Sequence, residues 1–232
     1  MIGIFDSGVG GFASLRRLRE LCPNLDVCYL ADRKNAPYGT KTAEKLKELV
    51  LRDINILREA GASNILAACC TASAVIDAMS DSARRSVTTI ITPTARAAAR
   101  RTKNKKIALL CTYATARSSA FERAILRIDS EIEVRTQPSK RLVELAERGA
   151  RDGNLSNSEL AVLREEVSPL LGFGADTVIL GCTHFSHLRA AISDYLGADF
   201  VSAADEGAEL MARTVGNVGN GKTIYICPDK VI

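Results

Sequence analysis

The amino-acid sequence predicts an α/β protein made of two similar doubly wound lobes with mostly parallel sheets. Three observations support this prediction. Apolar runs rich in β-branched residues alternate with helical patterns along all 232 residues, which is typical of sheets covered by helices on both faces. Two of these runs end in Cys-Thr and continue directly into helix-forming sequence, within residues 64–75 and 177–188. The composition, 47% hydrophobic and 25% charged, is that of an ordinary globular chain.

Nine short segments are predicted to be strands. Most are too uniformly apolar to leave one face in water, so we expect parallel strands covered on both sides. In chain order they are IGIF (2–5), VCYLA (27–31), NILAACC (64–70), VTTII (87–91), KIALLC (106–111), IEVRT (132–136), TVILGC (177–182), DFVS (199–202) and TIYIC (223–227).

Helical patterns separate these strands. Residues 41–60, 116–128 and 139–150 carry apolar residues at helical spacing. The stripe is clearest in the first of these segments, where it consists of Leu46, Leu49, Val50 and Ile54.

Nine strands can form one wide sheet or two smaller ones. Residues 91–106 interrupt the apolar rhythm with Pro93 and several basic residues, and we expect the chain to cross between two lobes there. The predicted lobes are residues 1–94 plus 206–232, and residues 95–205. Ligands bind outside the carboxyl ends of parallel strands. Lobes that face each other by those ends place Cys69 or Cys70 opposite Cys182, with the active site in the cleft between them.

Composition and charge disfavour several classes of protein. The net charge is only +4, and no basic tract is interleaved with aromatic residues, so we expect no nucleic-acid partner. No apolar run reaches transmembrane length, so we expect no membrane insertion. The N-terminus lacks the features of a secretion signal, which predicts a cytoplasmic protein with reduced cysteines. A zinc site at Cys182, His184 and His187 is disfavoured because no spacing of the usual sites matches, and we expect no metal.

Polar residues follow the first predicted strand in the segment FDSGVGG (5–11). Its three glycines allow backbone amides to approach a carboxylate or phosphate at a helix start. The spacing is not that of a dinucleotide-binding fingerprint. Asp6 is a candidate ligand group, electrostatic partner or helix cap. In APYGTKT (36–42), the simplest interpretation is a turn before a helix that Thr40 or Thr42 caps.

Two cysteine-containing strand ends are stronger signals. Four other cysteines have the pattern of small buried hydrophobes: Cys22, Cys28, Cys111 and Cys227. A thiol at a strand end that opens a helix lies at the positive end of the helix, so we expect its pKa to fall. His184 can hold or accept a proton beside Cys182. Two such thiols permit a disulfide, a nucleophile with a resolving partner, or a paired acid and base, which is a racemase arrangement.

Taken together, these segments resemble the cofactor-independent glutamate racemases of the aspartate/glutamate racemase superfamily, and the matches run in that family's order over nearly the whole chain. The matching segments are FDSGVGG (5–11), Asp32 with PYGTK (37–41), CxTASA (69–74), CTYATARSS (111–119), PSKRLVELAERG (138–149) and GCTHF (181–185).

The resemblance implies that glutamate binds between the lobes and that D-glutamate is supplied for peptidoglycan, with no cofactor. No lysine lies in a pyridoxal-binding context either. The implied acid/base thiols are Cys69 and Cys182, and Asp6, His184 and Glu147 support them. The implied substrate-binding residues are Asp6, Ser7, Pro37, Tyr38, Gly39, Cys70, Thr71, Thr112, Thr115, Thr183 and His184.

One departure from the family lies next to the first catalytic cysteine, where Cys70 replaces the family's Asn. Asn donates and accepts hydrogen bonds that a thiol cannot replace, and losing charge-assisted bonds costs about 1.5–3 kcal/mol, roughly ten- to a hundredfold in binding. The alternatives are therefore a racemase of another acidic amino acid such as aspartate, or a glutamate-binding homologue with weak or no turnover. A thiol-redox protein using Cys69 and Cys70 ranks last because adjacent cysteines form strained disulfides.

The same replacement raises a question of assignment. Neighbouring residues of a strand point to opposite faces, so we expect only one of Cys69 and Cys70 to face the cleft, and the family motif favours Cys69. The second departure is at the C-terminus, where the family continues into another helix. We expect one flank of the first lobe to be bare and to be covered by a second subunit in a homodimer.

Overall fold

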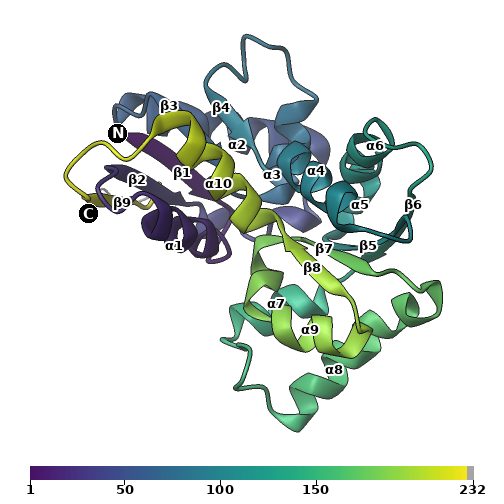
Figure 1. The fold of residues 1–232 in the computed structure, drawn as a ribbon. Helices are drawn as coiled ribbons and strands as arrows, with labels where there is room; N and C mark the ends of the chain where they lie inside the picture. Colours follow the sequence, from purple (N-terminus) through teal and green to yellow (C-terminus); the bar gives the residue numbers. More distant parts are fainter. Residues whose placement is uncertain (229–232) are drawn as a thin grey trace.

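The computed structural model describes residues 1–228, which form two parallel sheets flanked by helices (Figure 1). The first sheet has the order β4-β3-β1-β2-β9 and the second has the order β6-β5-β7-β8. Every strand pairing is parallel. The strands are β1 (Ile2–Asp6), β2 (Val27–Ala31), β3 (Asn64–Ala67), β4 (Val87–Thr89), β5 (Lys106–Cys111), β6 (Glu133–Pro138), β7 (Thr177–Gly181), β8 (Asp199–Ser202) and β9 (Thr223–Ile226).

The prediction of two parallel α/β lobes is thus confirmed, and each of the nine predicted segments contains a strand. The helices are α1 (Phe12–Leu21), α2 (Ala43–Glu59), α3 (Cys70–Asp77), α4 (Ile91–Arg101), α5 (Tyr113–Ser118), α6 (Ala120–Leu126), α7 (Arg141–Glu147), α8 (Asn157–Val167), α9 (Arg189–Leu196) and α10 (Ala203–Val215). Residues 1–228 also contain four 3-10 helices: η1 (Arg33–Asn35), η2 (Tyr38–Thr40), η3 (Ser168–Phe173) and η4 (Thr183–His187).

Two helical predictions differ in outcome. The helix predicted over 41–60 is α2, and the hydroxyl of Thr42 caps it by accepting a hydrogen bond from the Lys45 amide at 3.3 Å. The stripe at 116–128 is not one helix, because Ser119 adopts a left-handed conformation with φ of 48° and separates α5 from α6. Left-handed residues end a right-handed helix.

The chain crosses between the lobes twice. Residues 91–106, expected as a crossing, contain α4, which joins β4 of the first sheet to β5 of the second. The return crossing is α10, which joins β8 to β9. These two helices pack against each other at the junction of the lobes (Figure 1). The predicted lobe boundaries, 94/95 and 205/206, both fall inside these helices and stay a prediction.

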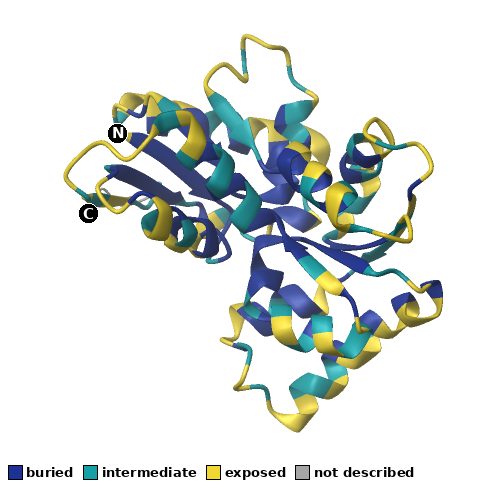
Figure 2. Cartoon of the chain, in the orientation of Figure 1, coloured by how far each residue is buried: buried dark blue, intermediate teal, exposed yellow. Residues whose placement is uncertain are grey.

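The apolar core is continuous across the two lobes. The inner strands β1, β2, β3, β5 and β7 are almost entirely buried, while the outer faces of the helices are exposed (Figure 2). One cluster contains Ile4 of the first sheet, Leu109 of the second sheet and Met211 of α10, each with no exposed surface. Apolar burial of this kind is the main stabilising contribution. It ties the lobes together where the chain crosses.

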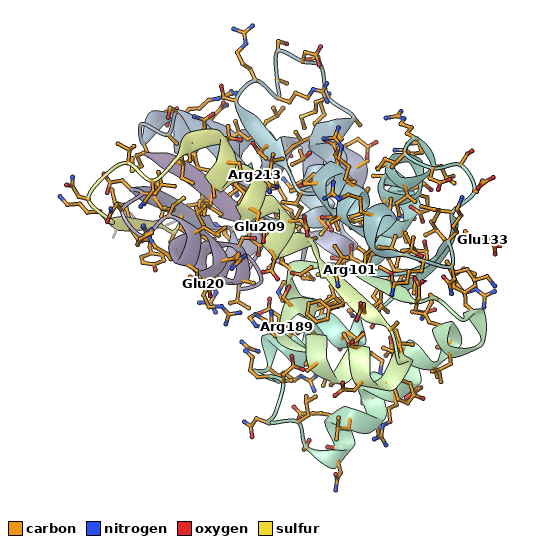
Figure 3. All side chains as sticks on the ribbon, viewed as in Figure 1. Glu20, Arg101, Glu133, Arg189, Glu209 and Arg213 are labelled. Atoms are coloured by element: carbon orange, nitrogen blue, oxygen red, sulfur yellow. The ribbon has the colours of Figure 1, made fainter. Side chains whose placement is uncertain are left out.

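Helix α10 is held mainly by these apolar contacts. Figure 3 shows Glu209 projecting from α10, where it accepts a hydrogen bond from Arg17 of α1 at 2.8 Å. Partly exposed ion pairs of this type contribute about 0–1 kcal/mol. Helix α10 also lies very close to Ile90 at Gly207. A Cβ atom at Gly207 would lie 2.2 Å from Cγ2 of Ile90, so only glycine fits there. Within residues 1–228, no helix is both long and apolar enough to span a bilayer.

Candidate active site

The two Cys-Thr segments meet at one small cavity. Strand β3 ends at Ala67 and Cys69 is the residue before α3, while Cys182 directly follows β7 and precedes η4. Both cysteines line a cavity of about 20 Å³, which has room for about one water molecule. The other lining residues are Ser7, Pro37, Tyr38, Gly39, Cys70, Thr71, Thr112, Val143, Thr183 and His184. The predicted facing of the two lobes by their strand ends is therefore observed.

Cys69 and Cys70 both reach this cavity, so the expectation that only one of them does is wrong. Strand alternation does not apply, because β3 ends at Ala67 and Cys70 is already the first residue of α3. The two side chains nevertheless pack differently. Cys69 belongs to the apolar cluster of Phe5 and Leu30, and Cys70 belongs to the cluster that crosses the lobes.

The thiol of Cys69 is protonated under ordinary conditions. Burial and, second, the negative charge of Asp6 raise its pKa to about 12. Hydrogen bonds to the sulfur from the Ala72 amide and from the Ser7 hydroxyl, which lies 3.7 Å from Sγ, oppose the rise only partly. The prediction that the helix start lowers the pKa is wrong for Cys69, because desolvation of a thiolate outweighs the helix dipole. Burial likewise raises the pKa of Cys70.

Cys182 has a different partner, an imidazole. Its Sγ lies 3.6 Å from Nδ1 of His184, and Nε2 of His184 lies 2.5 Å from Oε1 of Glu147. Burial alone would lower the pKa of His184, but its hydrogen bonds to Cys182 and Glu147 outweigh burial and raise the pKa well above the ordinary value. The pKa of Glu147 is lowered, first by its hydrogen bond to His184. The three side chains form a chain from the cavity to the surface.

Asp6 joins the first lobe to the second beneath the cavity. One carboxylate oxygen accepts from the Gly8 amide at 2.8 Å, and the other accepts from the hydroxyl of Thr183 at 3.2 Å. The side chain is fully buried. Burial raises its pKa, although the charge of His184 opposes the rise. The helix-cap alternative for Asp6 is wrong, because the residue before α1 is Gly11 and that cap uses no side chain.

The glycines of the first loop allow the second lobe to approach. A Cβ atom on Gly10 would lie 2.3 Å from Oγ1 of Thr183 and 2.9 Å from the His184 amide. A Cβ atom on Gly8 would lie 2.9 Å from Oε1 of Glu147. Real Cβ atoms do not come so close to other atoms, so the lobes can meet here only against glycine.

Three threonine hydroxyls close another side of the cavity. Thr71 of the first lobe lies 3.0 Å from the hydroxyl of Thr112 and 3.1 Å from that of Thr115, both in the second lobe. The hydroxyls of Thr112 and Thr115 are 3.0 Å apart. Each hydroxyl can donate one hydrogen bond and accept others. The triangle is therefore a polar contact between the lobes.

Tyr38 is held by two buried carboxylates. Its hydroxyl lies 2.7 Å from Oδ2 of Asp32 and 2.7 Å from Oδ2 of Asp53. Arg52 pairs with both carboxylates, at 2.6 Å and 2.7 Å. Burial raises the pKa of Asp53 to about 6, although Tyr38 and Arg52 oppose the rise. This cluster fixes the turn that carries Pro37, Tyr38 and Gly39 against the second lobe.

Most predicted site residues line the cavity, and three lie behind it. Asp6 supports Thr183, Glu147 supports His184, and Thr115 contacts Thr71. Two residues escaped the sequence analysis. Val143 of α7 lines the cavity, and no local signal marks it. Asp53 does carry a signal, a carboxylate on the buried stripe of α2.

Within residues 1–228, no group of three or more His, Cys, Asp or Glu side chains is arranged to hold a metal ion. His187 has a buried Nε2 without a hydrogen-bond partner. Burial lowers its pKa to about 4, so the ring is neutral at ordinary pH.

Two α/β lobes that each bring a cysteine to one cavity are the arrangement of a two-lobed racemase, an isomerase. A family model described as Asp/Glu/Hydantoin racemase matches residues 14–211. The chain belongs to this family.

Known relatives are similar over most of their length. A glutamate racemase from Herpetosiphon aurantiacus is 37% identical over 215 residues, which cover 92% of this chain and 82% of the relative. The crystal structure of a glutamate racemase isoform from Bacillus anthracis has a TM-score of 0.88 at 28% identity, covering 98% of this chain and 87% of the other. A glutamate racemase from Francisella tularensis, crystallised with D-glutamate, shares the fold with a TM-score of 0.89 at 24% identity, covering 99% and 88%.

Proposed function

We propose that this protein is a cofactor-independent glutamate racemase that interconverts L- and D-glutamate with two cysteines. The observation that carries the proposal is that Cys69 and Cys182 come from opposite lobes and line the same cavity. The similarity to the Herpetosiphon aurantiacus enzyme, which is named glutamate racemase, supports glutamate as the substrate. It favours glutamate over aspartate.

In the proposed reaction, the thiolate of one cysteine removes the α-proton and becomes a thiol. The other cysteine donates its proton to the opposite face of the same carbon and becomes a thiolate. Cys69 acts as the base for one enantiomer and Cys182 for the other. Because the pKa of Cys69 is high, its thiolate is a strong base. For the same reason only a small fraction of the Cys69 side chains is in the thiolate form.

The supporting residues divide between the two thiols. We propose that the imidazolium of His184, held by Glu147, lies against the Cys182 sulfur and offsets the negative charge that this sulfur carries during proton transfer. Asp6 orders the first loop and keeps a negative charge near Cys69. The proposed substrate is a dicarboxylate with one ammonium group, so its site needs hydroxyl, amide and imidazole donors as well as acceptors. The proposed substrate-binding residues are Asp6, Ser7, Pro37, Tyr38, Gly39, Cys70, Thr71, Thr112, Thr115, Thr183 and His184.

Binding of glutamate requires the lobes to separate. The cavity between the thiols is about 20 Å³, smaller than any amino acid. Two of the contacts between the lobes, Thr183 with Asp6 and Thr71 with Thr112, are hydrogen bonds that can break and form again as the lobes move. We propose that substrate binds to a more open form.

The test is solvent exchange at the α-carbon. The purified protein is expected to incorporate deuterium from D₂O into both L- and D-glutamate, and far more slowly into aspartate. Cys182→Ala and Cys69→Ala should each abolish interconversion. A Cys182→Ala protein that still exchanges the α-proton of both enantiomers would contradict the mechanism. Binding of glutamate with no exchange would favour the non-catalytic alternative.

We further propose a homodimer in the cytoplasm, supplying D-glutamate for peptidoglycan. All seven cysteines are unpaired, which suits a reducing compartment. Strand β9 lies at one edge of the first sheet, and there Phe12, Ile224 and Tyr225 are 40%, 49% and 50% exposed. Exposed apolar groups on an edge strand favour association. Analytical ultracentrifugation should give a dimer, and Tyr225→Lys should give a monomer.

A further inference from the structure

A second, larger cavity opens between the lobes beside the candidate active site. Its volume is about 570 Å³. Its lining residues come mainly from helices α2 and α3 of the first lobe and α5 and α6 of the second. Much of its lining is apolar and consists of Leu46, Leu51, Ala74, Val75, Ala78, Met79, Ala83 and Ala114.

The charged lining of this cavity is entirely basic. Lys41, Lys47, Arg117 and Arg123 line it, and no carboxylate does. None of the four cations forms an ion pair within residues 1–228. Lysine and arginine side chains are the usual partners of phosphate groups, and a low-dielectric wall strengthens their field. An apolar wall with unpaired cations is complementary to a molecule that carries both an apolar group and an anionic group.

We propose that this cavity binds an organic phosphate with an apolar body. The phosphate would lie against the cations, and the body would lie against the side chains of α2 and α3. Arg123 is already oriented, because its guanidinium donates to the Ser118 carbonyl at 2.6 Å. A planar guanidinium can still use its remaining donors for phosphate oxygens.

The position of the cavity predicts an effect on the active site. Thr71 lines both cavities, and its hydroxyl contacts Thr112 and Thr115 across the junction. A ligand that touches both lobes stabilises their present arrangement, in which the catalytic cavity is about 20 Å³. It should therefore oppose the binding of glutamate, and glutamate should oppose it equally. This regulatory effect rests on the proposed function, whereas binding of the phosphate does not.

Binding can be measured by titration calorimetry on the full-length protein with 1-naphthyl phosphate as the probe. We expect saturable one-to-one binding, and binding at least tenfold weaker for 1-naphthol and for inorganic phosphate, since each lacks one half of the recognition. The double variant Lys47→Gln/Arg123→Gln should weaken binding about tenfold. Ala78→Phe should abolish binding of the probe, because the phenyl ring would project into the cavity that Ala78 lines.

The matched control is Arg84→Gln. Arg84 is an exposed cation on the loop after α3 that pairs with Asp81 and does not line the cavity, so this variant should bind the probe like the parent. The proposal is overturned if the probe does not bind, or if all variants bind it equally. It is also overturned if inorganic phosphate alone binds as tightly.

Regulation is measured separately. Saturating 1-naphthyl phosphate should raise the KM for glutamate at least threefold in the parent and leave it unchanged in Ala78→Phe. Equal inhibition of both proteins would mean that the probe occupies the active site, which would overturn the coupling. If the protein does not racemise glutamate, the proposed function is overturned. The calorimetric measurement would still show whether the cavity binds the organic phosphate.

Discussion

Oε1 of Glu147 lies 2.5 Å from Nε2 of His184, so a partly exposed carboxylate holds an imidazole that is itself buried. The other ring nitrogen of His184 faces Cys182. The corresponding partner of Cys69 is an uncharged hydroxyl, that of Ser7. The two thiols at the cavity therefore have different neighbours, an imidazole beside Cys182 and a hydroxyl beside Cys69. This asymmetry leads to the first prediction.

Replacing Glu147 should impair one direction of proton transfer more than the other. Glu147→Gln removes a hydrogen bond that raises the pKa of His184, so less imidazolium faces Cys182 to offset the negative charge on its sulfur. We expect about a tenfold loss, about 1.4 kcal/mol, in the deuterium exchange of the enantiomer for which Cys182 is the base. Glu144→Gln on the same helix, whose partner is Lys140, should change neither rate. Equal losses for both enantiomers would contradict this prediction.

A methyl group at Gly10 should drive the lobes apart. The Gly10→Ala side chain would lie 2.3 Å from Oγ1 of Thr183, and overpacking of this kind costs about 1–3 kcal/mol. We expect a lower midpoint of urea unfolding and loss of most racemase activity. Gly172→Ala is the control, because no atom lies within 4 Å of its added Cβ. A Gly10→Ala protein with unchanged activity would show that the lobes need not meet at this point.

Restoring the family's amide at position 70 should strengthen substrate binding. Cys70 lines the cavity, and burial keeps its thiol uncharged by raising its pKa, so it offers glutamate only a weak hydrogen bond. Cys70→Asn should lower the KM for glutamate about tenfold, as expected for a gained charge-assisted bond. Cys70→Ala, which removes the thiol without adding an amide, should not lower the KM. A Cys70→Asn protein with a raised KM would show that the site has been rebuilt around the thiol.

The buried cluster around Tyr38 should make stability depend on pH. Burial raises the pKa of Asp53 from its ordinary value of 3.8 to about 6 in the folded protein. Because the folded value is raised, Asp53 favours the folded state at low pH, and this contribution is lost as the pH rises from about 4 to about 7. The free energy of unfolding of the parent, relative to Asp53→Asn, should thus fall by about 2–3 kcal/mol over this range.

Urea titrations at several pH values measure this difference. Asp81→Asn is the control, since the Asp81 side chain is 91% exposed, and its difference from the parent should not vary in the same way. A constant difference between the parent and Asp53→Asn would contradict the proposed titration.

The sequence predicted the parts of the site that depend on local pattern. Strand ends are readable because apolar runs stop where the chain leaves the sheet, and parallel strands bring their carboxyl ends to one edge. The strand ends indicated Cys182 and either Cys69 or Cys70, and the position of His184 two residues after Cys182 made it a candidate partner. The resemblance to a known family then favoured Cys69 and added Glu147, which the strand pattern alone does not connect.

What the sequence could not predict depends on how the lobes meet. The role of Gly10 follows from the position of Thr183, which is far away in the sequence. Val143 looks like any other apolar residue of α7. The pKa of Cys69 was predicted in the wrong direction, because a helix start is visible in a sequence whereas the depth of burial is not.

The paired crossings of α4 and α10 have a mechanical consequence. A single connection would let the two lobes rotate relative to each other about several axes. Two neighbouring helical connections restrict this motion to a hinge. The remaining easy motion is rotation about one axis that passes near both helices. The cleft must then open on the side away from that axis. A cross-link between α4 and α10 should therefore leave turnover intact. A cross-link that joins Gly39 to Thr112 should hold the cleft closed and abolish turnover.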